Sequence, residues 1–264
     1  MIISHDYKFI FFEVNKTGTS TLHARLSKFN DFLDLEKPTF NPELNKTLSR
    51  HITISDLSRL PIYDSCKDYF KFCFVRNPYE YFYSRCQFDA SPRYIEHCEE
   101  QGRNNPHWKM SEAQLNKLKQ CNDHNGNFLF DVYLDSFDAF SRISEGGFFK
   151  AWSHLGEKCA MNFIGKNENF EQDFEKICGI IGLPYNDIPT LSKNIITKPL
   201  IQGCDSFFED GSVYKYLHHY DIDTLQALNQ KCQQDFELFG YRQISVNELI
   251  EYKKWYSNEQ NSNI

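Results

Sequence analysis

Two short apolar runs stand out from the polar background of the N-terminal part of the chain. Residues 8–14 (KFIFFEV) and 70–75 (FKFCFV) are rich in residues that favour β-structure, and each predicts a buried strand. A polar break and a helical pattern follow each run, STLHARLSKF after the first and YEYFYSRCQF after the second. Because strands joined through helices pair in parallel, the pattern predicts an α/β fold with a central parallel sheet flanked by helices.

Further elements are predicted by apolar runs or by apolar positions at helical spacing. They are a strand at residues 162–165 and helices at residues 128–143, 168–181 and 222–236. Between residues 87 and 127 the chain is polar, and we expect it to be irregular except for one helix. That helix begins at Ser111, because Ser111 and Gln114 form a capping-box pattern.

Length and composition favour one domain. The 264 residues are 41% hydrophobic, which is enough for a full core, and no repeat, low-complexity block or long linker divides them. The last residues are polar, and we expect the extreme tail to be frayed. We therefore predict a single domain over residues 1–245, followed by a polar C-terminal extension over residues 246–264.

Charge and cysteine content exclude several classes of protein. A net charge of −7 argues against a nucleic-acid partner. No apolar segment reaches the roughly 20 residues that cross a bilayer, and MIISHDYKF lacks the pattern of a signal peptide, so we expect a cytoplasmic protein without a membrane partner. Nine cysteines without a C-x-x-C pair are typical of reduced thiols. Cys121 and His124 have a spacing that suits a metal, but no second pair accompanies them, and we predict no metal site.

The loop after the first predicted strand has the composition of an anion-binding site. Glycine lets main-chain N–H groups turn inward, and hydroxyl groups add donors at a helix N-terminus. In a Walker A loop the lysine follows the last glycine, whereas here Lys16 precedes Gly18, which counts against a kinase or NTPase. We expect Lys16 to reach the bridging oxygen of a transferring group, next to a 5′ phosphate. The candidate binding residues are Lys16, Thr17, Gly18, Thr19, Ser20 and Thr21.

A second loop, VRNPYEYFYSR, follows the second predicted strand. Arg76 stands at the strand end, Asn77 is a candidate N-cap, and Pro78 suits the first helical turn. Ser84 follows about two helical turns later. The carboxyl ends of parallel strands share one edge of a sheet, where ligands bind. Arg76 and Ser84 are therefore predicted to hold a second phosphate at the edge that carries the first loop.

Taken together, these motifs resemble those of sulfotransferases that use 3′-phosphoadenosine 5′-phosphosulfate (PAPS). KTGTST and FVRNPYEYFYS resemble the 5′-phosphosulfate and 3′-phosphate motifs of the family 2-like branch, which includes many carbohydrate sulfotransferases. RHITISDL, FIGKNENFEQDFEKICGIIGLP and DFELFGY resemble further segments of that branch, so the likeness covers residues 8–241. The chain departs from the usual pattern at Asn15, Thr19, Tyr81, Lys166 and Asn167.

The resemblance implies a P-loop-NTPase-like sulfotransferase fold and in-line transfer of a sulfuryl group from PAPS to an acceptor hydroxyl, without a required metal. Lys16 would neutralise charge on the departing phosphate. His51 is the candidate base, with a structural hydrogen bond as its alternative role, and Glu13 is the second candidate base. Lys193 comes from the segment that covers the nucleotide in relatives, unless it is simply a solvated lysine.

Two other functions remain open from the sequence. One is a P-loop-like kinase that acts on a small molecule, and the other is a nucleotide-binding protein that has lost catalysis. The acidic composition disfavours a polyanionic acceptor, because bound anionic units need nearby cations. We therefore expect a small-molecule or neutral carbohydrate acceptor, with residues 87–127 supplying most of its contacts.

Overall fold

The computed structural model describes residues 1–32, 39–104, 110–137, 153–154, 158–188, 207–208 and 214–262. By its internal contacts the chain divides into two compact units, each assembled from three segments. The first unit comprises Met1–Asn77, Gly146–Pro199 and Glu237–Tyr241, and the second comprises Pro78–Glu145, Leu200–Phe236 and Arg242–Ile264. The domain boundary at residue 245 stays a prediction.

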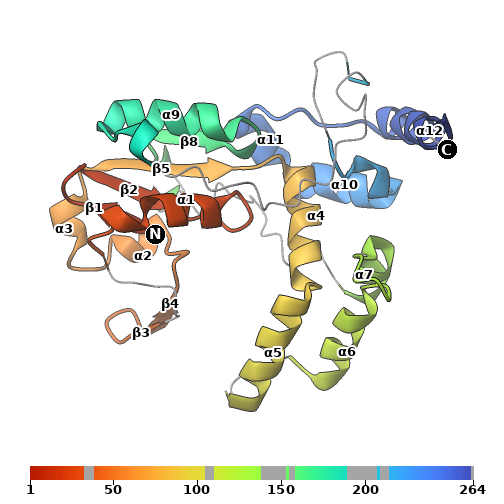
Figure 1. Cartoon of the computed structure of the whole chain (residues 1–264), viewed down its shortest axis with the longest axis horizontal. Helices are drawn as coiled ribbons and strands as arrows, with labels where there is room; N and C mark the ends of the chain where they lie inside the picture. Colours follow the sequence, from red (N-terminus) through yellow and green to blue (C-terminus); the bar gives the residue numbers. More distant parts are fainter. Residues whose placement is uncertain are drawn as a thin grey trace. The chain divides into compact units, whose positions relative to one another are not determined.

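The first unit is built on a four-stranded sheet of order β1-β2-β5-β8 (Figure 1). Its strands are β1 (Ile2–Ser4), β2 (Phe9–Phe12), β5 (Phe70–Val75) and β8 (Phe163–Lys166). β5 pairs in parallel with both β2 and β8, while β1 is antiparallel to β2. The predicted α/β class and three predicted strands are confirmed. The sequence did not predict β1, whose three residues are too few to show a pattern.

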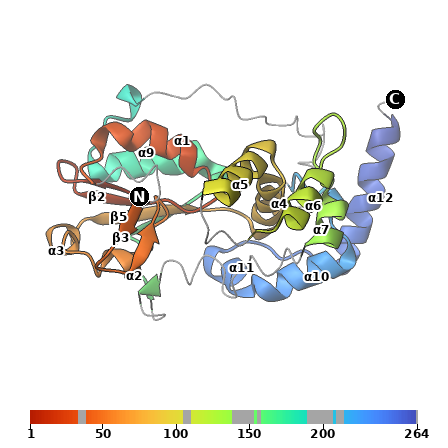
Figure 2. The same cartoon turned by 90° about the horizontal axis from the view of Figure 1, so that it is seen from below.

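Helices cover both faces of this sheet. α1 (Thr19–Leu26) and α9 (Phe170–Ile181) pack on one face, where alternate strand residues such as Phe11, Phe72 and Phe74 form one core with Leu22 and Phe174. Figure 2 shows α2 (Ile54–Leu57) and α3 (Tyr63–Cys66) on the opposite side of the strands. The remaining elements of this unit are short. They are η1 (Ser27–Phe29), β3 (Thr39–Asn41), β4 (Lys46–Leu48), β6 (Ser153–His154), β7 (Lys158–Cys159), η3 (Asn167–Asn169) and η4 (Tyr185–Asp187).

The described part of the second unit is helical. Its elements are α4 (Pro78–Asp89), α5 (Pro92–Asn104), α6 (Glu112–Gln120), α7 (Phe130–Ser136), η6 (Leu217–His219), α10 (Ile222–Lys231), the start of α11 (Gln233–Phe239) and α12 (Val246–Ser262). Aromatic side chains fill its interior: the ring of Tyr83 stacks on Tyr216 at 4.1 Å, and Tyr220 donates a hydrogen bond to the main-chain oxygen of Tyr79.

The prediction that residues 87–127 are largely irregular is wrong. α4 continues to Asp89, and α5 adds 13 helical residues, among which Ile95 and Cys98 are buried. The apolar residues of α5 do fall at helical spacing, but the segment is strongly polar overall, which favours its interpretation as irregular. The predicted capping box of α6 is confirmed, with Ser111 and Gln114 bonded in both directions. The helix predicted at residues 128–143 forms as α7, and its part beyond residue 137 lies outside the described residues.

The C-terminal extension is also more ordered than its composition indicates. α12 occupies most of residues 246–264, and its Leu249 and Tyr252 are both 1% exposed. The Tyr252 hydroxyl donates to the main-chain oxygen of Tyr214 at 3.2 Å. The polar extension is therefore helical as far as Ser262, and the last two residues lie outside the described part. Among the described helices, none combines the length and apolar character that a membrane span requires.

Candidate functional site

The predicted anion loop leaves the carboxyl end of β2 and turns into α1. Lys16 and Gly18 both have left-handed backbone conformations, with φ of 62° and 83°, and Gly18 is the N-cap of α1. No side chain among the described residues caps this helix, so its first turn offers main-chain donors to an anion. A Cβ on Gly18 would lie 2.8 Å from Asn167 Nδ2 and 2.9 Å from Phe170 Cε2, so only glycine fits.

The hydroxyl groups of the loop fall into two kinds. Thr17 is fully buried, and its Oγ1 donates to the main-chain oxygen of Val14 at 3.1 Å, which closes the loop on itself. Thr19 is only 4% exposed. Ser20 is exposed and Thr21 is partly exposed. The site therefore presents the Ser20 and Thr21 hydroxyls to solvent, whereas the Thr17 hydroxyl shapes the main chain.

Arg76 lies directly after β5, as predicted, and the structure brings it to the anion loop. Its Nη1 donates to the main-chain oxygen of Lys16 at 3.5 Å. The next residue, Asn77, donates its main-chain N–H to Glu168 Oε1 at 2.8 Å, and the hydroxyl of Tyr241 donates to Glu168 Oε2 at 2.9 Å. Neither Glu168 nor Tyr241 was predicted from the sequence, although both lie in the motifs that carry the family resemblance.

Two other predicted ligands lie outside the described part of the first unit. Ser84 lies on α4 in the second unit, and its side chain is partly buried. Lys193 lies outside the described residues. Their roles in phosphate binding stay predictions.

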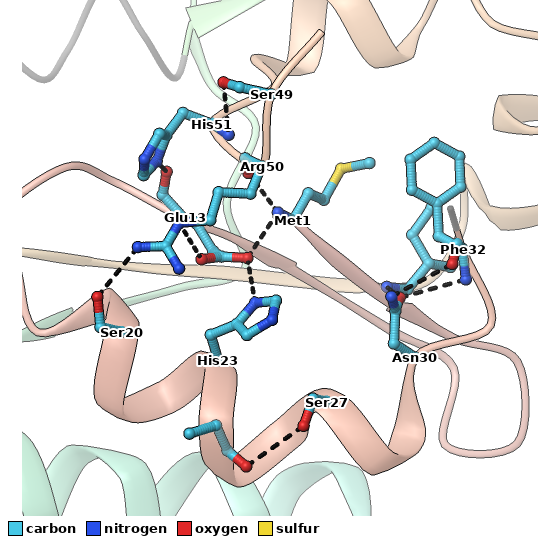
Figure 3. A network of polar contacts seen from close by, with 12 residues as sticks. Met1, Glu13, Ser20, His23, Ser27, Asn30, Phe32, Ser49, Arg50 and His51 are labelled. Atoms are coloured by element: carbon cyan, nitrogen blue, oxygen red, sulfur yellow. Dashed lines mark hydrogen bonds and ion pairs between the residues drawn. The ribbon is translucent and has the colours of Figure 1, made fainter. Parts of the chain in front are cut away.

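A buried carboxylate, Glu13, lies beside the loop at the end of β2 (Figure 3). Its Oε1 accepts hydrogen bonds from His23 Nδ1 and from the amino group of Met1, each at 2.8 Å. Its Oε2 lies 3.5 Å from Arg50 Nε. Burial raises the pKa of Glu13, but the His23 hydrogen bond and the Met1 ammonium outweigh it, and the pKa falls below its ordinary value. Glu13 is therefore ionised and surrounded by cationic or donor groups.

His51 is held against the main chain of the same strand end. Its Nδ1 lies 2.8 Å from the main-chain oxygen of Glu13. A carbonyl oxygen only accepts, so Nδ1 carries the hydrogen, and in the neutral ring the lone pair lies on Nε2. Burial lowers the pKa of His51 below its ordinary value, and the neighbouring Arg50 guanidinium lowers it further. His51 is thus neutral near pH 7, which is the form that can accept a proton.

Arg50 connects the two parts of the site, and the sequence did not predict this role. Its Nη2 donates to Ser20 Oγ at 3.0 Å, so the segment that carries His51 is bonded to the first turn of α1 (Figure 3). In the sequence, only its place beside His51 distinguishes it from other arginines.

Cys121 and His124, whose spacing could suit a metal, are not part of a ligand cluster in the described structure. Among the described residues, no group of three or more His, Cys, Asp or Glu side chains is placed to hold an ion. Cys121 is fully buried, and its Sγ donates to the main-chain oxygen of Lys117 at 3.2 Å. Burial raises the pKa of this thiol to about 11, so it is protonated near pH 7.

Comparison with known proteins identifies the family. The chain is 22% identical to carbohydrate sulfotransferase 10 of Xenopus laevis over 258 residues, which cover 92% of this chain and 67% of that protein. No solved structure gives a significant match. The sulfotransferase family matches residues 1–242, which include the anion loop, His51 and Arg76. The resemblance seen in the motifs is confirmed, and the chain belongs to the sulfotransferase family.

Proposed function

We propose that this protein transfers a sulfuryl group from PAPS to a hydroxyl group of an acceptor. Family membership supports sulfuryl transfer in general. The observation that carries the specific proposal is the bond from His51 Nδ1 to the main chain of Glu13, two residues before the anion loop begins. It sets the free Nε2 lone pair of a neutral histidine at the same strand end as the anion loop. A base and an anion site together suit transfer to a hydroxyl group.

The residues at the end of β2 and β5 fit the two anionic ends of PAPS. The main-chain donors of the first turn of α1, with Lys16, suit the 5′-phosphosulfate, and Arg76 suits the 3′-phosphate. In the proposed reaction an oxygen–sulfur bond forms to the acceptor as the sulfur–oxygen bond to the phosphate breaks. His51 Nε2 takes the hydroxyl proton, and Lys16 neutralises the charge that grows on the departing phosphate.

The surroundings of the two candidate bases favour His51. Both oxygens of Glu13 face cationic or donor groups, and its side chain is fully buried. Its lowered pKa makes it a poor proton acceptor. We therefore assign the base role to His51 and a structural role to Glu13.

For the acceptor we propose a hydroxyl group of a neutral carbohydrate or small molecule. The name of the Xenopus laevis relative supports a carbohydrate. The net charge of −7 supports a neutral acceptor rather than a polyanionic one. The cytoplasm stays our proposed compartment, on the cysteine composition of the sequence.

The test compares donors and acceptors in one set of assays. Calorimetry measures binding of PAPS, adenosine 3′,5′-bisphosphate and ATP with magnesium, and labelled PAPS is offered with neutral oligosaccharides, small hydroxyl compounds and a heparin-like polymer. We expect binding of PAPS and the bisphosphate, and labelling of a neutral acceptor. A preference for ATP with magnesium would indicate a kinase, and bisphosphate binding without any transfer would indicate an inactive binder. Salt-sensitive labelling of the polymer alone would contradict the proposed acceptor.

A further inference from the structure

Arg50 lies between the buried carboxylate of Glu13 and Ser20, at the exposed end of the anion loop. Its Nε is 3.5 Å from Glu13 Oε2, and its Nη2 is 3.0 Å from Ser20 Oγ. The side chain of Glu13 is fully buried, whereas that of Arg50 is 29% exposed. Figure 3 shows the guanidinium between these two groups, with Ser20 on the first turn of α1. The buried charge thus fixes one side of the guanidinium, and Ser20 is bonded to the other.

The chemistry of the two groups restricts the direction of the Ser20 O–H bond. A guanidinium only donates hydrogen bonds, so Ser20 Oγ is the acceptor in this contact. The single O–H hydrogen of Ser20 must then point away from Arg50. A serine in a first helical turn otherwise rotates freely or bonds to its own backbone. The contact therefore excludes hydroxyl orientations that point the hydrogen at Arg50 before any anion binds.

We propose that Arg50 is a positioning residue of the donor site, which acts by holding Ser20 Oγ so that its O–H group is aimed at the donor anion. This inference rests on the proposed function, because it concerns the same donor. Glu13 contributes indirectly, since it holds Arg50. Donors that are already oriented stabilise an anion without having to reorganise during the reaction. Arg50 should therefore affect the rate, because it holds the hydroxyl of Ser20.

A double-mutant cycle tests this role directly. Ser20→Ala, Arg50→Met and the double variant are compared by kcat/KM for PAPS, at a pH above the acidic limb of the rate profile so that His51 stays neutral in every variant. Each single change should lower kcat/KM by about tenfold to a hundredfold, the value of one hydrogen bond to a charged group. Because Arg50 acts through Ser20, its replacement should have little further effect in the Ser20→Ala background.

Stability controls separate positioning from folding. Arg50→Met leaves the buried Glu13 with one cation fewer, which can destabilise the fold. If thermal melting shows that the Arg50→Met variant is unfolded, Arg50→Lys takes its place in the cycle. Lys46→Gln is the matched control, because Lys46 forms an ion pair with Asp56 at 2.8 Å in the same unit and makes no contact with the loop in the described structure. This control should leave kcat/KM unchanged.

The outcomes distinguish this inference from the proposed function. The effect of Arg50→Met is expressed as the change in log(kcat/KM). If this change in the Ser20→Ala background is less than half of its value in the wild type, the positioning role is supported. An effect of half or more overturns it and leaves the sulfotransferase proposal standing. If the wild type transfers no sulfuryl group, the cycle is measured on the dissociation constant of PAPS with the same criterion. If the wild type does not bind PAPS either, both proposals are wrong.

Discussion

Two arginine–carboxylate pairs involve α1 or its flanking loop, and they are built in opposite ways. Beside the start of the helix the carboxylate of Glu13 is fully buried, and its partner Arg50 is 29% exposed. Near the end of the helix the side chain of Arg25 is 1% exposed, and its partner Glu171 is 47% exposed. Arg25 makes two hydrogen bonds to Glu171, at 2.9 and 3.0 Å, and lies 4.3 Å from the ring centre of Phe174.

The difference separates a binding arrangement from a structural one. The buried Glu13 carboxylate holds the partly exposed Arg50 guanidinium where an incoming anion can contact it. Arg25 is buried beside an aromatic ring, and its Nη1 is hydrogen-bonded to Glu171 of α9, so it joins that helix to α1. Substitutions around Glu13 should therefore change activity, whereas substitutions around Arg25 should change stability.

The largest effect is expected for His51→Ala. Loss of a general base should lower kcat by about 10²- to 10⁴-fold, while the melting temperature and the dissociation constant of PAPS stay close to those of the wild type. In the wild type the acidic limb of the pH profile of kcat/KM should lie below pH 6.5, the ordinary pKa of histidine. The pKa of His51 is lowered in the folded protein, and activity is lost only when the ring is protonated. A variant with near wild-type kcat would move the base role to another residue.

Lys16→Ala should have the next largest effect. It should lower kcat by roughly 10²-fold and weaken binding of adenosine 3′,5′-bisphosphate less, since Lys16 acts on charge that develops during transfer. Arg76→Ala is the matched variant. It should mainly weaken bisphosphate binding, because the 3′-phosphate is present in ground and transition states alike. The reverse pattern in steady-state kinetics and calorimetry would show that the two loops have been assigned to the wrong phosphates.

Much of the first unit could be predicted from the sequence, because its strands and loops are marked by short stretches of neighbouring residues. The strands at Phe9–Phe12 and Phe70–Val75 are short apolar runs, and the anion loop and Arg76 follow them directly. Their meeting at one sheet edge follows from parallel pairing. α5 and α12 were missed because each buries few side chains among many polar ones.

The contacts that organise the site are long-range, and local sequence does not reveal them. Arg50 reaches Ser20 across 30 positions, and Arg25 reaches Glu171 across 146. Nothing in the pattern around Arg25 indicates a buried cation, since arginine is usually exposed. Glu13 was noticed only as a candidate base, and its burial among donors became evident from the structure.

Arg25→Met tests the structural side of the comparison. The variant keeps most of the side-chain volume but loses the two hydrogen bonds to Glu171 and the contact over Phe174. Since Glu171 is half-exposed and can be solvated, the free energy of unfolding should fall by only about 1–2 kcal/mol. Urea unfolding measures this change. At a temperature where the variant is folded, kcat should equal that of the wild type, and a specific loss of kcat would mean that this cluster also serves the site.

The smallest effect is expected in the pH dependence of the unfolding free energy in acid, to which the ionisation of Glu13 contributes. The folded pKa of Glu13 is lowered below 4.5, so its stabilising contribution is complete above the unfolded pKa and is lost as the pH falls through the folded pKa. Glu13→Gln should therefore flatten the dependence of the unfolding free energy on pH below 4.5, as measured by urea unfolding across that range. The lowered pKa of His51 gives a slope of the same sign that sets in at a higher pH, below 6.5 rather than below 4.5. An acid limb that is unchanged in Glu13→Gln would mean that the buried carboxylate is no more acidic in the folded chain than in the unfolded one, and the contrast with the Arg25 cluster would lose its electrostatic basis.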